Sequence, residues 1–488
     1  MKLLIKKYFN FFEQNLLNIS IIILFILTLI TLVAALNGFP ISIGDKEGFY
    51  PVIHNIKTVN EFSHPFMCYT CEERIGNPLN EKFTNHGFLY PLVHSFFLFF
   101  DEYEKIETGS TIIFLINGIL FILLIGINNL KSFVIFIISL SFFLYQIGRP
   151  ELLISSILII DWFITKKNYF NYPEIFLSLI SAVLFCINPL SLILYFPYIA
   201  IKNHHFKIDS NYYINYKYFL LTPFFIFICF FLAVDQFLFI DWIKGMINAS
   251  KHYHPASLLS DDTYSKYGHT SLNEYWTYFI KGPRFLPLVF LCFLSFYISL
   301  INNCLGSDKK YKFFVIIFLL LITWFGLRRP IFLYNVYAFV PFILLILNFD
   351  NNFISKLSKI FLSFFFLLCS VSIIFYSMFI PFITILVGND VKTLKNSILK
   401  TGSTKTIQMS KMFWMHSQKG DNIRVITSSI NNTKIFDADV IYFSSLELRY
   451  INEQQIPEIK GYCIKEIKLQ SLKIKLYDYS YIKFIKCS

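Results

Sequence analysis

Long apolar runs, separated by short lysine clusters, are the feature that most limits what this chain can fold into. Residues 19–36 carry no charged side chain and are long enough to cross a bilayer as a helix. Of the 488 residues, 55% are hydrophobic, 59 are Phe and only 15% are charged. One water-soluble core cannot enclose so much apolar surface, so the sequence predicts a polytopic, all-α membrane domain.

The formal net charge of +12 comes with lysines that lie between the apolar runs rather than on one nucleic-acid-binding surface. The clusters are Lys2, Lys6 and Lys7; Lys166 and Lys167; Lys202 and Lys207; and Lys309, Lys310 and Lys312. Lysines gather in the cytoplasmic loops of membrane proteins, so this pattern predicts orientation signals and a cytoplasmic N-terminus. It predicts no nucleic-acid partner.

If the chain has eleven spans, every multi-lysine loop lies on the cytoplasmic side of the plasma (inner) membrane, with the C-terminal domain as the one exception. The predicted spans are 19–36, 109–128, 131–147, 150–165, 174–188, 189–201, 217–240, 284–303, 311–327, 330–348 and 358–387. The predicted outer segments are 39–107, 148–150, 241–284, 328–330 and everything from 388 onward. A cleaved signal peptide, ending near Val33-Ala34-Ala35, is the alternative to an uncleaved first span.

The chain changes character near residue 388, which divides it into a membrane domain, 1–388, and a soluble extracytoplasmic domain, 389–488. Residues 421–430, 438–445 and 471–488 alternate or run apolar over strand lengths. Residues 401–419 are long enough for a helix. The expected C-terminal domain is therefore small and of the α/β class.

Four of the nine cysteines fall in predicted outer segments: Cys68, Cys71, Cys463 and Cys487. An even number of cysteines in an oxidising compartment predicts two disulfides, most simply Cys68–Cys71 and Cys463–Cys487. A zinc site around His64, Cys68 and Cys71 is the alternative, but a second Cys-x-x-Cys motif is absent from the sequence. The remaining five cysteines lie in or beside spans, where packing is the expected role.

Two carboxylates, Asp45 and Glu47, stand just beyond the first span. Paired acids at a membrane surface suit a general base or a divalent metal such as Mg²⁺ or Mn²⁺, although a solvated turn gives the same pattern. The same outer loop ends with His86, followed by an apolar stretch, 88–100, that is too short to span and predicts an interfacial helix. His86 is either a substrate-binding side chain or a structural loop histidine.

Charged residues also stand at the outer ends of later spans. Arg149 and Glu151 flank a proline in one outer turn and either pair with each other or face a polar cavity. Arg328 and Arg329 in another turn suit a phosphate group, or else reach toward lipid headgroups. The loop 241–284, with Lys251, is polar and long enough to cover a site.

Four segments of this chain resemble motifs of the membrane glycosyltransferases of the C-type fold (GT-C). Asp45–Tyr50 is similar to the Asp-Glu-Ala-x-Tyr motif that opens the first outer loop in the family-39-like group, which includes protein mannosyltransferases and lipid A aminoarabinose transferases. The other three are Asn85–Leu92, Gly148–Glu151 and Asn335–Pro341. Lys46 separates the acidic pair here, and the double proline typical of the second motif is absent.

The resemblance implies transfer of a sugar from a polyprenyl-phosphate donor to a lipid, glycan or protein acceptor at the outer face. One of Asp45 and Glu47 would deprotonate the acceptor hydroxyl, and the sugar would invert. Together with Glu151, basic residues would hold the substrate and would stabilise the phosphate as it leaves. They include His86, Arg149, Lys251, Arg328 and Arg329.

Three other classes remain open from the sequence. A glycan polymerase or ligase of the O-antigen type also spans many times, but its large outer loop usually lies late in the chain. A lipid-linked glycan transporter or flippase predicts inverted repeats and intramembrane charges, whereas no repeat is visible and Asp161 lies near a span end. A receptor or scaffold does not need acids and arginines gathered on one membrane face.

Overall fold

The computed structural model describes the greater part of the helical region and the strands of the C-terminal region. The described residues are 15–38, 46–64, 81–82, 87–100, 102–167, 173–206, 216–234, 239–253, 309–328, 333–349, 356–401, 405–410, 413, 416, 422–426, 438–444, 459–469 and 479–487. Among the predicted features, the span 284–303 and the residues Asp45, Cys68, Cys71, His86 and Arg329 lie outside these ranges.

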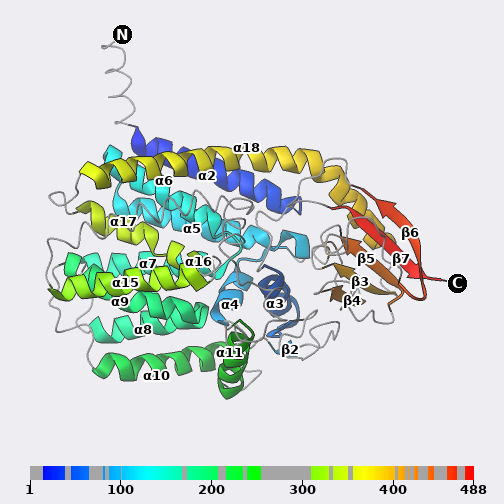
Figure 1. Ribbon diagram of the computed structural model, residues 1–488, viewed down its shortest axis with the longest axis horizontal. Coiled ribbons are helices and arrows are strands. Elements are labelled where there is room, and N and C mark those ends of the chain that lie inside the picture. Colours follow the sequence, from blue (N-terminus) through cyan, green and yellow to red (C-terminus); the bar gives the residue numbers. More distant parts are fainter. Residues whose placement is uncertain are drawn as a thin grey trace, which may run out of the picture.

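The long helices lie side by side in a bundle, whose axis runs horizontally in Figure 1. They are α2 (Leu16–Leu36), α5 (Glu107–Ile125), α6 (Leu130–Tyr145), α7 (Pro150–Lys167), α8 (Pro173–Ile187), α9 (Pro189–His205), α10 (Tyr216–Ala233), α15 (Lys309–Arg328), α17 (Val340–Phe349) and α18 (Lys356–Thr401). A short helix, α16 (Leu333–Tyr337), precedes α17.

Several short elements gather at one end of this bundle, between the long helices and the C-terminal sheet (Figure 1). They are α3 (Lys46–Val59), the two-stranded ribbon β1 (Ser63–His64) and β2 (Glu81–Lys82), α4 (Leu89–Phe96), the 3-10 turn η1 (Tyr103–Lys105) and α11 (Phe239–Tyr253). We call this end of the bundle the sheet end. The described part of the predicted first outer loop thus folds onto the bundle.

Local sequence explains how consecutive helices turn back on each other. At the end away from the sheet, α5 stops at Gly126, whose positive φ of 60° suits glycine, and α6 starts from an Asn129–Ser132 capping box. At the sheet end, Asn188 separates α8 from α9, and its side-chain Oδ1 accepts a hydrogen bond from the Leu190 backbone N–H at 3.1 Å. Pro189 is the first residue of α9, where a missing N–H costs nothing. The segment predicted as two spans, 174–188 and 189–201, is therefore two helices that pack against each other.

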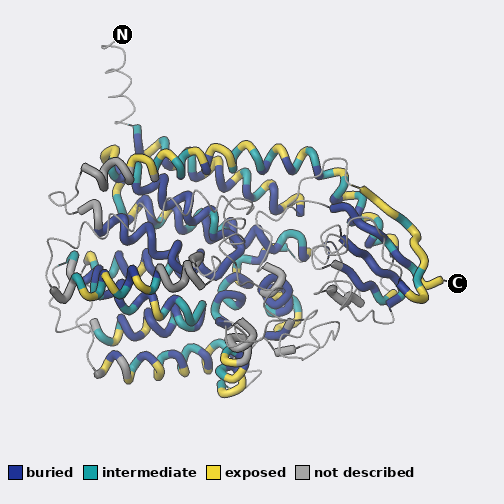
Figure 2. Tube along the Cα trace, in the orientation of Figure 1, coloured by how far each residue is buried: buried dark blue, intermediate teal, exposed yellow. Residues whose placement is uncertain are grey.

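Large apolar side chains point outward along the outer helices, which is the reverse of a water-soluble bundle. Figure 2 shows exposed stretches along α18, α2 and α10. On α18 they include Phe364, Leu367, Val371, Ile374, Phe375, Met378, Phe382 and Ile385. Exposed apolar bands of this extent mark a surface that meets a membrane or another protein, and three of the helices are long and apolar enough to cross a bilayer. The outer helices therefore indicate a membrane protein.

The structure does not support the predicted count of eleven spans. By length and composition, three helices in the described part of the chain can cross a bilayer: Leu16–Leu36, Tyr103–Ile125 and Phe366–Thr401. Five further apolar helical stretches are only 10–17 residues long. Other predicted spans form helices that carry charged side chains, such as Glu151 and Asp161 on α7. The prediction counted apolar runs and did not take these charges into account.

Lys202 does not lie in a solvated cytoplasmic loop, so that prediction is wrong. The helix α9 continues past the predicted end at 201 to His205, and Lys202 is fully buried. Its Nζ donates hydrogen bonds to Asp161 Oδ1 at 2.6 Å and to Thr165 Oγ1 at 3.0 Å, both on α7. Asp161, which was predicted near a span end, supplies the opposite charge that allows this lysine to be buried.

The last helix, α18, runs unbroken for 46 residues from Lys356 to Thr401. It packs on α2 and α6 along the bundle and then continues past the predicted span end at 387 and the predicted boundary at 388 (Figure 1). Its last turns lie on the C-terminal sheet, where the Tyr442 hydroxyl donates to the Ser397 carbonyl at 2.8 Å and lies 2.8 Å from Thr401 Oγ1. One helix therefore belongs to both parts of the molecule.

The C-terminal sheet is mixed and five-stranded, in the order β4-β3-β5-β7-β6. Its strands are β3 (Thr406–Ser410), β4 (Asn422–Ile426), β5 (Val440–Ser444), β6 (Tyr462–Lys468) and β7 (Tyr481–Lys486). The strand β3 pairs in parallel with β4 and β5, whereas β7 pairs antiparallel with β5 and β6. The three predicted strand segments contain β4, β5 and β7, and a small mixed sheet near the C-terminus is confirmed.

The expected helix over residues 401–419 is wrong in its central part, because β3 occupies Thr406–Ser410. Ile407 and Met409 of β3 are fully buried, and the strand lies between two parallel partners. Pairing with strands distant in sequence therefore decides this segment, and local helix propensity does not.

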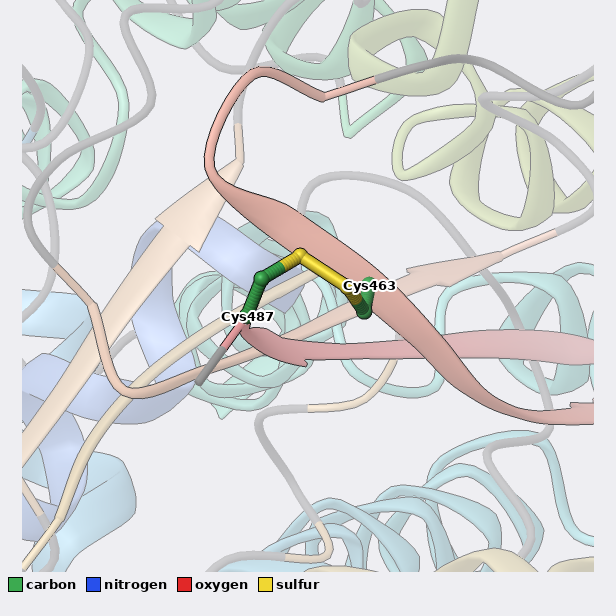
Figure 3. Close-up of a disulfide and its surroundings, with 2 residues drawn as sticks. All are labelled: Cys463 and Cys487. Carbon is green, nitrogen blue, oxygen red and sulfur yellow. A yellow bond between two sulfur atoms is a disulfide. The ribbon is translucent and has the colours of Figure 1, made fainter.

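Cys463 and Cys487 form a disulfide that joins the start of β6 to the end of β7 (Figure 3). This is the pairing that the sequence predicts for these two cysteines. It closes a segment of 24 residues at the edge of the sheet, because β6 is the outermost strand on that side. Cys186, Cys229 and Cys369, in or beside the bundle, are free thiols.

Candidate functional site

The residues predicted for the site are only partly described. Asp45, His86 and Arg329 lie outside the described residues. Glu47 stands in the first turn of α3, Lys251 in the last turn of α11 and Arg328 at the end of α15, with their backbones described and their side chains not. Only Arg149 and Glu151 are described in full. Their surroundings define the candidate site.

The helices α3 and α4 pack together over the sheet end of the bundle. The rings of Phe49 and Tyr90 meet edge to face with centroids 5.1 Å apart, and those of Tyr50 and His94 at 5.8 Å. The helix α4 lies within the stretch 88–100 that was predicted as an interfacial helix. It buries Tyr90 and His94 and leaves Phe96 exposed. One face of α4 therefore packs on the protein and the other is open, and its location at the membrane interface stays a prediction.

Two glycines, one just before α4 and one on α5, allow α4 to approach the bundle closely. A Cβ on Gly87 would lie 2.2 Å from the backbone oxygen of Ile187, at the end of α8. A Cβ on Gly109 would lie 2.6 Å from the ring of His94. Any larger residue at either position would push α4 away, so these glycines permit the buried position of His94.

Polar side chains meet beneath α3 and α4 and form what we call the sheet-end cluster: Tyr50, Tyr90, His94, Glu107 and Ser110. His94 lies at its centre. Its Nε2 is 3.2 Å from the Ile106 carbonyl, which can only accept, so this nitrogen carries a proton. In the neutral ring Nδ1 then accepts from the Tyr90 hydroxyl at 3.3 Å. These bonds fix both the orientation and the tautomer of the imidazole.

The two tyrosines of the cluster stay protonated. Burial, and then the charge of Glu107, raises the pKa of Tyr50 well above its usual value. Burial also raises the pKa of Tyr90, although a hydrogen bond with Ser110 acts in the opposite direction. Glu107 itself is buried in the first turn of α5, where the helix dipole favours a negative charge. The cluster thus offers protonated hydroxyls beside a buried carboxyl group.

Arg149 and Glu151 form an ion pair in the turn between α6 and α7, with Arg149 Nε 3.1 Å from Glu151 Oε2. Both side chains are buried, so mutual pairing, one of the two predicted alternatives, is what the structure contains. Ser155 supports the turn by donating to Gln146 Oε1 at 2.9 Å. The charge of Glu151 also raises the pKa of the Tyr90 hydroxyl and that of Arg149 lowers it, so this pair acts electrostatically on the sheet-end cluster.

Sequence reasoning missed Tyr50, Tyr90, His94 and Glu107. One signal was present: Tyr90 and His94 are four residues apart, which places them on the same face of a helix. The sequence gives no comparable sign for Glu107, because its burial depends on α3 and α4 folding over the start of α5.

No three His, Cys, Asp or Glu side chains lie together as metal ligands in the described part of the chain. The predicted Mg²⁺ or Mn²⁺ at Asp45 and Glu47 stays a prediction, since neither side chain is described. Compared with family models, curated proteins and solved structures, the chain matches none.

Proposed function

We propose that this protein is a membrane glycosyltransferase that moves a sugar from a polyprenyl-phosphate donor to an acceptor on the outer face of the membrane. One observation supports this most: segments that resemble three separate family motifs converge at the sheet end. Tyr50 closes the acidic motif, Tyr90 belongs to the second motif, and Arg149 with Glu151 forms the third. Tyr50 contacts His94, His94 contacts Tyr90, and the Arg149–Glu151 pair acts on Tyr90.

The fourth family-like segment is tied to the same end of the bundle. Asn335, which opens it, accepts a hydrogen bond at 2.7 Å from the side chain of Asn188, in the turn between α8 and α9. Four segments spread over most of the chain therefore meet in one region. A membrane enzyme that binds a lipid-linked substrate needs such a gathering at a single membrane face.

In the proposed reaction Asp45 takes the proton of the acceptor hydroxyl, whose oxygen attacks the anomeric carbon of the donor. The bond from that carbon to the phosphate oxygen breaks, the configuration inverts, and the polyprenyl phosphate leaves with the bonding electrons. Glu47 positions the acceptor or a divalent cation. Arg328 and Arg329 stabilise the phosphate.

The catalytic test is glycosyl transfer in proteoliposomes with a polyprenyl-phosphate sugar. Asp45→Asn should reduce turnover at least about a hundredfold, as expected for loss of a general base. Asp390→Asn, the same change on α18 outside the bundle, is the matched control and should keep full turnover. Should Asp45→Asn and Glu47→Gln both keep full activity, these acids are a solvated turn and the proposed site is wrong.

The proposal places the N-terminus in the cytoplasm and the sheet outside, as the lysine pattern of the sequence predicts. Reporter fusions at Lys167, Lys207 and Lys310 should therefore give a cytoplasmic signal. Fusions at His254 and after Gly388 should give an outer signal. A cytoplasmic signal after Gly388 would contradict both this orientation and the location of the site.

One observation favours a second function, transport of a lipid-linked glycan. The Asp161–Lys202 pair lies buried inside the bundle, and ionisable residues at such depth often line a transport path. A transporter would lose lipid translocation in the double variant Asp161→Leu/Lys202→Met, whereas the proposed glycosyltransferase would keep its sugar transfer. An O-antigen-type polymerase or ligase would instead use lipid-linked glycans as both substrates, which product analysis in the same proteoliposomes distinguishes.

A further inference from the structure

Glu104, in η1, contacts the C-terminal part of the chain through both of its carboxylate oxygens. Its Oε1 pairs with Lys395 Nζ on α18, and its Oε2 lies 3.6 Å from Nδ1 of His416, which follows β3. His416 is almost completely buried and packs on the Tyr479 ring. A side chain from the predicted first outer loop is therefore enclosed by two elements of the sheet region.

The first span also meets this carboxylate. Gly38, two residues after the end of α2, has a positive φ of 75°, and a Cβ there would lie 3.1 Å from Glu104 Oε2. The segments that surround Glu104 thus come from the end of α2, the last part of α18 and the sheet. These segments are far apart in the sequence, so the contact can form only when they assemble.

The same short turn also touches the sheet-end cluster. Tyr103, next to Glu104, packs its ring on His54 of α3 with centroids 4.1 Å apart. Ile106, two residues later, presents its carbonyl to His94. Any displacement of η1 therefore reaches both α3 and α4.

We propose that Glu104 is a positioning residue: it docks the C-terminal sheet on the sheet end of the bundle and thereby sets the position of α3. Glu47 lies in the first turn of α3 and Asp45 directly precedes this helix in the sequence, so the position of α3 bears on both proposed acids. The part of this inference that concerns catalysis rests on the proposed glycosyltransferase function. The docking itself does not.

Electrostatics agree with this role. Burial alone would raise the pKa of Glu104, but the nearby His416 ring and Lys395, which donates a hydrogen bond to Oε1, lower it to about 2. The other charged groups of this turn are Glu102 and Lys105, which pair with each other at 2.8 Å at the surface. Glu104 therefore stays ionised at any physiological pH.

The turn provides its own matched control. Glu102→Gln removes an exposed ion pair two residues away that does not touch the sheet, whereas Glu104→Gln removes the docking charge. The measurement is backbone hydrogen–deuterium exchange of α3 and of η1 in the full-length protein in proteoliposomes. Glu104→Gln should speed exchange in α3 about fivefold, as expected for loss of a charge-assisted pair that water partly reaches. Glu102→Gln should leave exchange as in the wild type.

Two further variants separate docking from misfolding. Glu104→Asp keeps the charge and should recover at least part of the protection. The double variant Glu104→Gln/Lys395→Met should exchange no faster than Glu104→Gln alone, because both changes break the same contact. Equal exchange in Glu104→Gln and Glu102→Gln overturns the inference, and so does a double variant that adds both effects.

Sugar transfer by the same variants distinguishes the two proposals. Glu104→Gln should lower turnover and Glu102→Gln should not. If exchange changes as expected while the wild type transfers no sugar, the docking role stands and the proposed function fails. If the wild type is active and Glu104→Gln keeps both its exchange protection and its turnover, the docking role fails alone.

Discussion

Two regions of this molecule each contain an ion pair between a lysine and a carboxylate, but the two pairs differ in their exposure to water. In the interior of the bundle, Asp161 and Lys202 are both completely buried. At the junction between the bundle and the sheet, Lys395 is one-third exposed beside Glu104. Removing one partner in the first region strands a charge away from water, whereas water reaches the second. Burial, and not the number of contacts, should therefore set the cost of breaking each pair.

Breaking the interior pair should have the largest effect. Lys202→Met leaves the Asp161 carboxylate without its partner and should lower the free energy of unfolding by about 3–5 kcal/mol. The double variant Asp161→Leu/Lys202→Met removes both charges and should be close to the wild type. Thermal unfolding in detergent measures both. A cost below about 1 kcal/mol for Lys202→Met would contradict the difference between the regions.

The Arg149–Glu151 pair, buried at the sheet end, provides an intermediate case. Arg149→Ala removes the partner of a carboxylate that is 3% exposed and should cost about 2–3 kcal/mol. Arg149→Lys keeps a charge but loses the Nε geometry and should cost less. The same unfolding measurement applies. If Arg149→Ala and Glu104→Gln lowered the free energy of unfolding equally, burial would not determine the cost of breaking these ion pairs.

Glu104 should give the smallest of the three effects, and one that depends on pH. Its folded-state pKa of about 2 lies below the ordinary value of 4.5, so its stabilisation is complete above about pH 4.5 and is lost as the pH falls toward 2. Because Lys395 is partly exposed, we expect about 1 kcal/mol at neutral pH. The difference in unfolding free energy between wild type and Glu104→Gln, measured from pH 2 to 7, should therefore vanish at the acidic end. A difference that persists at pH 2 would assign the effect to something other than this charge.

The sequence predicted what depends on local composition. The strand β5 lies within residues 438–445, the Cys463–Cys487 pair is bonded, and Arg149 meets Glu151 across one proline. The strand follows from the hydrophobic pattern, the disulfide from the even number of cysteines in predicted outer segments, and the ion pair is one of the two alternatives that adjacent charges offered.

Features that depend on distant partners were not predictable. Lys202 has the appearance of a loop lysine until Asp161, 41 residues earlier, is placed beside it. The strand β3 forms because β4 and β5 flank it, and His94 is buried because Gly109 allows the close approach. The choice of Asp45 over Glu47 as the general base rests on sequence position alone, because the structure describes neither carboxylate.

The unbroken helix α18 has a mechanical consequence. Its 46 residues span about 69 Å at the usual rise, more than twice the thickness of a hydrocarbon core of about 30 Å. The last exposed large apolar side chain among its described residues is Ile385, so the turns after Gly388 lack the exposed apolar band and form a stiff post that carries the sheet. Tilting is one way in which a helix adjusts to a thicker or thinner bilayer, and a tilt of α18 would move the sheet at its tip further than the helix moves inside the lipid. The bilayer's thickness would thus reach the site as a mechanical signal, through leverage and without any ligand.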